Sequence, residues 1–153
     1  MQVDALHIRI EVIDDTLPEG FETLRAAALA EGHRHVERLA KDWEAGTTRF
    51  DREGEALLAV RSGGVLAGIG GLTVDPVVPC ALRMRRFYVH PSFRRGGVGR
   101  QLATALLMRA GNGRPITVNA AAGSTAFWLA LDFVPDMRDG HTHVLTSNRP
   151  AAS

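Results

Sequence analysis

The sequence predicts an α+β fold in which one largely antiparallel sheet carries helices on its faces. Two observations support this prediction. Stretches that alternate apolar and polar residues first form a strand meander, and then alternate with segments of helical periodicity. No repeat, low-complexity tract or linker interrupts the 153 residues, so we expect a single domain over residues 1–153.

The first third of the chain predicts one strand and two helices. Residues 7–12 alternate as a strand does. A first helix is expected to open at Pro18 and to end at Gly32. A second helix is expected over residues 33–46, because one of its faces carries the apolar residues Val36, Leu39 and Trp43.

The rest of the chain predicts a hairpin followed by alternating strands and helices. Residues 55–75 predict two strands around the turn Ser62-Gly63-Gly64. One helix is expected to follow the glycines near residue 98, and a short one to cover residues 124–131. Further strands are expected at residues 82–89, 115–119, 133–136 and 141–147.

The strand over residues 82–89 contains a change of phase. Leu82 and Met84 are apolar on one phase of the alternation, and Phe87 and Val89 on the other. A β-bulge produces such a slip, because its extra residue shifts the register of the strand. Irregular alternation in a short strand explains the pattern equally well.

Charge is distributed unevenly along the chain. Residues 1–75 hold 14 acidic and 8 basic residues, whereas residues 76–131 hold 8 arginines and no acidic residue. A field of that sign attracts polyanions. A nucleic acid is one such partner, but the formal net charge of only +1 and the few aromatic residues available for base stacking argue against it.

The glycines before the third expected helix predict an anion-binding loop. The amides of a helix N-terminus have no partner within the helix, and glycines allow an anion to approach them. Nearby arginines add charge-assisted donors. The segment lacks the lysine of a Walker loop and the third glycine of a dinucleotide-binding loop, but it contains the pattern R-x-x-G-x-G at Arg94, Gly97 and Gly99.

At this pattern the sequence resembles the coenzyme A-binding motif of the GNAT superfamily of acyl-CoA N-acyltransferases. The resemblance rests on "RRFYVHPSFRRGGVGRQLATALL" and on the downstream "AFWLALDF", which is similar to the family's next motif; it covers roughly residues 82–133. It implies the GNAT fold, a three-layer α/β/α arrangement with a mixed, mostly antiparallel central sheet and helices on both faces. It also implies a bulge in the strand over residues 82–89 and acetyl-CoA as the acyl donor.

The resemblance further implies where coenzyme A would bind. The backbone of residues 95–100 would hold the pyrophosphate, and the main chain of Tyr88 and Val89 would pair with the pantetheine arm. The arm would pass where this strand separates from residues 115–119. The expected cofactor-binding residues are Phe87, Tyr88, Val89, Arg94, Arg95, Gly96, Gly97, Val98, Gly99 and Arg100.

The sequence departs from the family at the positions that carry proton transfer. Trp128 stands where the family usually has a tyrosine that protonates the departing thiolate, and Asp132 replaces a glycine. The acid-free segment also lacks the glutamate that many relatives use as a base. We therefore assign no catalytic residue; the candidates for acid or base are Glu31, His33, His35, Tyr88, Ser124, His141 and His143.

These observations predict an N-acetyltransferase that acts on the amine of a small molecule or peptide. A non-catalytic acyl-CoA-binding module is the alternative, because the tyrosine and the glutamate are missing. The acidic first half favours a cationic acceptor, although solvation of the surface explains those charges equally well.

The sequence predicts a cytoplasmic protein with no metal site and no nucleic-acid or membrane partner. The longest uncharged stretch, residues 115–131, is too short and polar to span a bilayer. The lone cysteine, Cys80, excludes an intrachain disulfide and is expected to be a small buried hydrophobe. The family often forms homodimers, so a homodimer is compatible with the resemblance.

Overall fold

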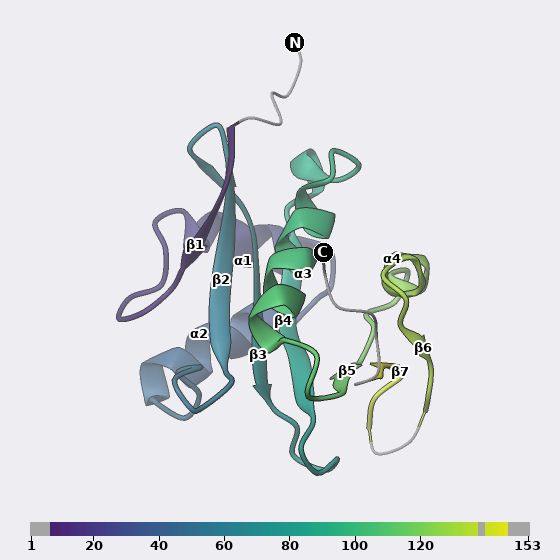
Figure 1. Cartoon of the computed structure of the whole chain (residues 1–153). Helices are drawn as coiled ribbons and strands as arrows, with labels where there is room; N and C mark the ends of the chain where they lie inside the picture. Colours follow the sequence, from purple (N-terminus) through teal and green to yellow (C-terminus); the bar gives the residue numbers. More distant parts are fainter. Residues whose placement is uncertain (1–6, 138–139, 147–153) are drawn as a thin grey trace.

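A seven-stranded sheet forms the centre of the computed structural model, which describes residues 7–137 and 140–146. Its strand order is β1-β2-β3-β4-β5-β7-β6 (Figure 1). The strands are β1 (Ile8–Val12), β2 (Ala56–Ser62), β3 (Val65–Val74), β4 (Leu82–Val89), β5 (Ile116–Val118), β6 (Val134–Pro135) and β7 (His143–Leu145). Only the β4–β5 pair is parallel within the described residues, so the sheet is mixed and mostly antiparallel, as predicted.

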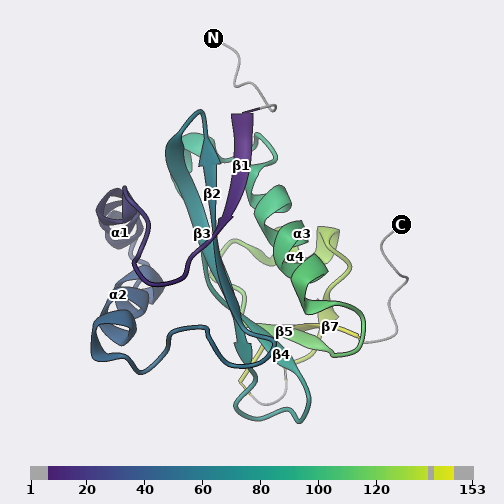
Figure 2. The same cartoon turned by 60° about the vertical axis from the view of Figure 1, so that its left-hand side comes forward.

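Helices cover both faces of this sheet. Figure 2 shows α1 (Phe21–Ala30) and α2 (His35–Ala45) on one side, and α3 (Val98–Ala110) and α4 (Thr125–Ala130) on the other. Each face has its own hydrophobic cluster. The predicted apolar face of α2 is buried through Val36, Leu39 and Trp43. The three-layer α/β/α fold is thereby confirmed.

The hairpin between β2 and β3 forms as its glycines predict. Ser62 pairs with Val65, which leaves a two-residue turn. Gly63 and Gly64 both have positive φ, at 58° and 83°. Such a turn follows the right-handed twist of the strands on either side.

Two local predictions were wrong. The first helix begins at Phe21, because Gly20, with φ of 91°, forms its N-cap and Pro18 lies in the preceding turn. Cys80 is exposed, since it lies in the connection between β3 and β4 and not in a packed element. Ser147, the last residue of the expected final strand, lies outside the described residues, and the single domain over residues 1–153 stays a prediction.

Strand β4 is bulged, and only half of its length has two neighbouring strands. Arg85 is paired with Gly71 and Tyr88 with Ile69, so two residues of β4 lie opposite one residue of β3. Arg86 takes up the extra length with φ of 55°. β5 pairs only with Leu82–Met84, which leaves the rest of β4 without a strand on that side. The predicted bulge is therefore confirmed, and it lies where the sheet opens.

Candidate active site

A cleft of about 950 Å³ opens where β4 and β5 separate. Its walls are the second half of β4, the end of β5 with the residues that follow it, the first turn of α3, and α4. The segment that joins α1 to α2, together with the start of α2, closes another side. The expected binding segments thus meet around one cavity.

The N-terminus of α3 opens into this cleft without a side-chain cap. Gly97 is the N-cap residue, with φ of 82°. The first helical hydrogen bond runs from the amide of Gln101 to the carbonyl of Gly97, at 3.0 Å, so the three preceding helical amides have no partner within the helix. A Cβ atom added to Gly96 or Gly97 would meet no atom within 4 Å. Open space therefore lies in front of the positive end of the helix.

Gly99 brings the first turn of α3 close to β4 and α4. A Cβ atom at this position would lie 3.3 Å from Val89 and 3.4 Å from Phe127. Beneath this contact the rings of Phe87 and Trp128 pack with centroids 5.1 Å apart. Trp128 is only 3% exposed, so it forms part of the cleft floor and of the core at once.

Two carbonyl groups of β4 face the cleft. His35 donates from Nε2 to the carbonyl of Phe87 at 3.0 Å, and Arg94 donates from Nε to the carbonyl of Val89 at 3.1 Å. The carbonyl of Tyr88 points the other way, because it would lie 2.9 Å from a Cβ atom on Gly68 of β3. Phe87 and Val89 thus present the main chain at the open edge of β4.

A hydrogen-bonded group holds the expected binding residues Arg94 and Tyr88 against Glu31. Arg94 binds the carboxylate with both terminal nitrogens, at 2.8 and 2.7 Å, and the Tyr88 hydroxyl donates to it at 2.5 Å. These bonds lower the pKa of Glu31 to about 2. Burial and the bond to Glu31 raise the pKa of Tyr88. The Arg94 guanidinium is therefore already paired with the Glu31 carboxylate, and the Tyr88 hydroxyl directs its proton to the same carboxylate.

Two histidines and a serine among the acid–base candidates line the cleft. His33, His35 and Tyr88 form edge-to-face ring contacts, with centroids 5.5 to 6.2 Å apart. Burial lowers the pKa of His35. Ser124, at the N-cap of α4, donates to the carbonyl of Ala121 at 2.7 Å. These side chains lie within reach of a ligand in the cleft.

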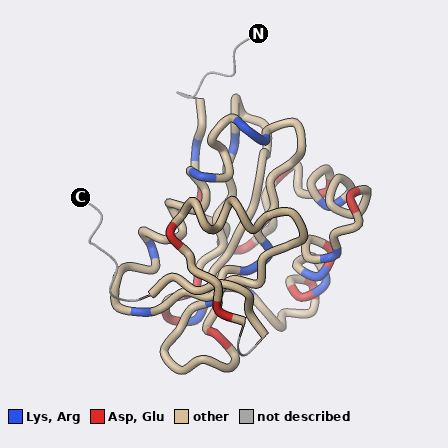
Figure 3. Tube along the Cα trace, turned by 90° about the vertical axis from the view of Figure 1, so that its right-hand side faces the viewer, with Lys and Arg blue, Asp and Glu red and all other residues tan. Residues whose placement is uncertain are grey.

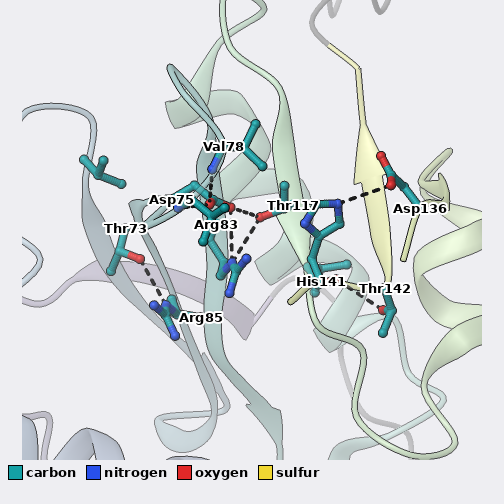
Figure 4. Close-up of polar contacts among 12 residues, drawn as sticks. Thr73, Asp75, Val78, Arg83, Arg85, Thr117, Asp136, His141 and Thr142 are labelled. Atoms are coloured by element: carbon teal, nitrogen blue, oxygen red, sulfur yellow. Dashed lines mark hydrogen bonds and ion pairs between the residues drawn. The ribbon is translucent and has the colours of Figure 1, made fainter. Parts of the chain in front are cut away.

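The other two histidine candidates lie elsewhere. His141 and His143 are 4% and 6% exposed, and neither belongs to the cleft wall. Nε2 of His141 lies 3.7 Å from Asp136, whereas Nδ1 of His143 lies 2.7 Å from the Thr142 hydroxyl. Figure 4 shows His141 beside Asp136. The structure therefore does not bring these two candidates to the site.

The sequence analysis missed the arginines that line the cleft away from the glycine loop. Arg34 is the N-cap residue of α2 and Arg38 lies within this helix, whereas Arg83, Arg85 and Arg86 come from β4. The spacing of four between Arg34 and Arg38 places them on one helix face and was the available signal. No signal in the sequence shows that α2 and β4 face the same cavity.

A family comparison covers most of the chain. The model described as "Acetyltransferase (GNAT) domain" matches residues 20–144. The chain belongs to the GNAT acetyltransferase family. Comparison with curated proteins gave no match.

Solved GNAT structures share the fold at low sequence identity. A candidate acetyltransferase from Exiguobacterium sp. 255-15 is 24% identical with a TM-score of 0.83, and the match covers 93% of this chain and 99% of the other. YncA from Salmonella typhimurium, a candidate acetyltransferase whose structure contains acetyl-CoA, is 15% identical with a TM-score of 0.65, covering 95% and 97%. The PaiA N-acetyltransferase from Thermoplasma acidophilum, in complex with coenzyme A, is 16% identical with a TM-score of 0.60, covering 90% and 96%.

The GNAT motif also accounts for the backbone at Asp132. This residue occupies the motif's glycine position and has φ of 71°. Aspartate is one of the few residues with a side chain that adopt this conformation. Asp132 thus adopts a conformation that a glycine at this position would favour.

Among the described residues, none of the helices has the length and apolar character needed to cross a membrane.

Proposed function

We propose that this GNAT domain is an N-acetyltransferase that transfers an acetyl group from acetyl-CoA to an amine. The observation that carries the proposal is the uncapped N-terminus of α3, which opens onto free space at Gly97 in the cleft wall. YncA and PaiA support it, because acetyl-CoA and coenzyme A occur in these structures of the same fold.

Coenzyme A would bind along the loop and the open edge of β4. Backbone amides from Arg95 to Arg100 would hold the pyrophosphate. The side chains of Arg95 and Arg100, which have no carboxylate within 4.0 Å in the described part of the chain, would add charge-assisted hydrogen bonds. The pantetheine arm would follow the main chain of Phe87 and Val89, whose carbonyls face the cleft.

The walls of the cleft would hold the thioester and the amine next to each other, which lowers the entropic part of the activation barrier. The C–N bond forms as the C–S bond breaks, the amine loses a proton, and the thiolate gains one. His35 is the base in this proposal. Its Nε2 carries a hydrogen because it donates to Phe87, so Nδ1 is left as the acceptor of the neutral ring.

The departing thiolate needs less assistance. A thiol has a reference pKa of about 8.5, roughly 1.5 units above neutral pH, so loss of an acid costs only about 2 kcal/mol of barrier. Trp128 cannot supply the proton. Ser124 is the hydroxyl that lines this part of the cleft, and with water it would take that role.

Release of free thiol tests the enzyme against the binding module. The protein is incubated with acetyl-CoA and a panel of primary amines, and free thiol is followed over time. Thiol release that depends on both protein and amine supports the transferase. If the protein binds acetyl-CoA saturably but releases thiol with none of the amines, the result would support the binding module instead.

A thermal shift tests the ligand by itself. Acetyl-CoA at a hundred times its dissociation constant should stabilise the fold by about 2.7 kcal/mol. Coenzyme A lacking the 3′-phosphate should bind more weakly, because one charged group is lost. An unchanged melting temperature at millimolar acetyl-CoA would overturn the assignment of the loop.

Oligonucleotide binding with a steep salt dependence would favour the nucleic-acid alternative.

A further inference from the structure

The cleft wall is cationic throughout. Eight arginines line it, and no aspartate or glutamate of the described residues does. The acidic residues of the first half of the chain lie elsewhere: Figure 3 shows acidic and basic positions interleaved along the two helices at the right, α1 and α2. The expected preference for a cationic acceptor therefore has no carboxylate in the cleft wall to support it.

Carboxylates outside the wall neutralise three of these arginines. Arg83 binds Asp75 at 3.2 Å, Arg86 binds Asp42 at 3.1 Å, and Arg94 binds Glu31 at 2.7 Å. Two more, Arg95 and Arg100, flank the glycine loop, where the proposed function uses them for phosphates. Three arginines remain: Arg34, Arg38 and Arg85.

None of these three has a carboxylate within 4.0 Å among residues 7–137 and 140–146. Arg34 and Arg38 are exposed on α2, where water solvates their charges. Arg85 is partly buried, and its one hydrogen bond within the described structure runs from Nε to the Thr73 hydroxyl at 3.1 Å. Both terminal nitrogens of Arg85 are therefore left for a ligand.

Arg83 and Arg85 lie on the same strand, but only Arg83 is paired with a carboxylate. Figure 4 shows Arg83 among Asp75 and Thr117, and Arg85 bonded to Thr73. Burial and repulsion from Arg86 and Arg83 lower the pKa of Arg85. A partly buried guanidinium without an anion is unfavourable, and an anionic ligand in the cleft would compensate it.

Arg85 lies too far from the glycine loop to serve the pyrophosphate. The first turn of α3 adjoins Val89. Arg85 is paired with Gly71 and Val89 with Gly68, so the two are separated by three residues of β3, a distance of about 10 Å at roughly 3.3 Å per residue. It therefore belongs to the part of the cleft beyond the bulge, on the side where β5 ends and α2 approaches.

We propose that the acceptor is an amine that carries a carboxylate or a phosphate, and that Arg85 binds this anionic group. The planar guanidinium can bind either group with two parallel hydrogen bonds. Arg34 and Arg38 on α2 add to the attraction. This inference rests on the proposed function, since it names the class of acceptor for the same site.

Matched pairs of amines test the inference. Acetyl-CoA-dependent thiol release is measured with L-leucine against L-leucinamide, and with phosphoethanolamine against ethanolamine. The α-amine of leucinamide is more easily deprotonated than that of leucine, so intrinsic reactivity favours leucinamide. We expect the anionic members to be the better substrates, with kcat/KM at least 10-fold higher. Leucine and phosphoethanolamine distinguish a carboxylate site from a phosphate site.

Variants assign the preference to Arg85. Arg85→Met should lower kcat/KM for the preferred anionic amine about 10- to 100-fold through KM, and should lower kcat/KM for the neutral partner much less, so that the ratio of the two falls. Arg85→Lys should restore part of the loss, because it keeps the charge. The matched control is Arg109→Met, which removes an exposed arginine of α3 that lies outside the cleft.

Failure of the inference differs from failure of the proposed function. Thiol release with neutral amines at least as fast as with their anionic partners would overturn the inference and leave the transferase intact. If no amine releases thiol, binding of phosphoethanolamine and L-leucine to the coenzyme A-bound protein is measured by calorimetry. Binding that Arg85→Met abolishes would still support the anion site, whereas absence of binding by both compounds would overturn it.

Discussion

The two halves of β4 have the same kind of sequence and opposite surroundings. Residues Leu82–Met84 have strands on both sides, and their arginine is neutralised by a buried carboxylate. From Arg85 onward the strand keeps only β3 as a neighbour, and Arg85 itself has no carboxylate within 4.0 Å in the described structure. The arginine of the first half is thus neutralised within the fold, whereas Arg85 is not.

This difference shows how one strand serves stability and binding at once. Asp75 receives hydrogen bonds from the amides of Val77 and Val78 at 2.8 Å and from the Thr117 hydroxyl at 2.6 Å. It thereby ties the β3–β4 connection to β5 and fixes the closed end of the cleft.

The largest expected effect concerns stability. Arg83→Met should lower the free energy of unfolding by about 3–5 kcal/mol, because it leaves the buried Asp75 without its cation. Arg85→Met should cost less, about 1–2 kcal/mol, because it abandons only the neutral hydroxyl of the buried Thr73 and no buried charge. Urea unfolding of both variants measures the difference. Equal losses would mean that the two halves of β4 do not differ in this way.

A rate effect follows for the open half. His35→Gln should reduce kcat about 100-fold, because a general base contributes at least that much. Glutamine can still donate to the carbonyl of Phe87, so the strand edge keeps its partner. In the wild type, activity should fall at low pH as His35 becomes protonated, below the ordinary histidine pKa because burial lowers the pKa of this ring. The variant should lose this acid limb.

The pH profile of kcat/KM between pH 4.5 and 8 checks this expectation. His33→Gln is the matched control, because His33 lines the same cleft. This variant should keep the acid limb of the pH profile. An unchanged profile in His35→Gln would exclude His35 as the base.

The glycine loop gives an effect on affinity. Gly97→Val should weaken coenzyme A binding at least about 10-fold, because a side chain would occupy the space in front of α3 and displace a charge-assisted hydrogen bond of roughly 1.5–3 kcal/mol. Valine also strains the backbone at the left-handed φ of Gly97, 82°. Gly46→Val is the matched control, since Gly46 has a similar φ of 72°, is equally uncrowded and lies outside the cleft. Calorimetric titration measures the dissociation constants, and equal affinities in both variants would contradict the loop assignment.

The smallest effect concerns the anchor of the open half. Glu31→Gln should cost about 1 kcal/mol at pH 7, because its ion pair with Arg94 is partly exposed. The folded-state pKa of about 2 lies below the ordinary 4.5, so the stabilisation is complete above pH 4.5 and is lost as pH falls toward 2. Melting temperatures of wild type and variant should differ by roughly 2–4 °C at pH 7 and converge below pH 4.5. A constant difference down to pH 2.5 would contradict this assignment.

Sequence patterns predicted the elements that depend on local periodicity. The bounds of β4, its bulge, the β2–β3 hairpin and the buried face of α2 follow from alternation, turn residues and helical spacing. The glycines that precede α3 were predicted because a loop at a helix N-terminus needs few residues, all adjacent in sequence; that this loop binds an anion stays a prediction.

The rest depends on contacts between distant residues. Glu31 and Arg94 are 63 positions apart, and no local pattern indicates that the arginine of the motif is already paired. The exposure of Cys80 follows from the length and path of a connection that periodicity does not describe. Likewise, the charge of the cleft wall emerges only when α2 and β4 are placed opposite one another, and the acidic composition of residues 1–75 does not indicate it.

The open edge of β4 has a consequence for the free protein. An unpaired strand edge is a template to which another extended chain can add, and aggregation begins at such edges. In this molecule the edge lies inside the sheet, and His35 and Arg94 each occupy one of its carbonyls. These two hydrogen bonds leave fewer unpaired backbone acceptors on β4 with which the edge of another chain could pair.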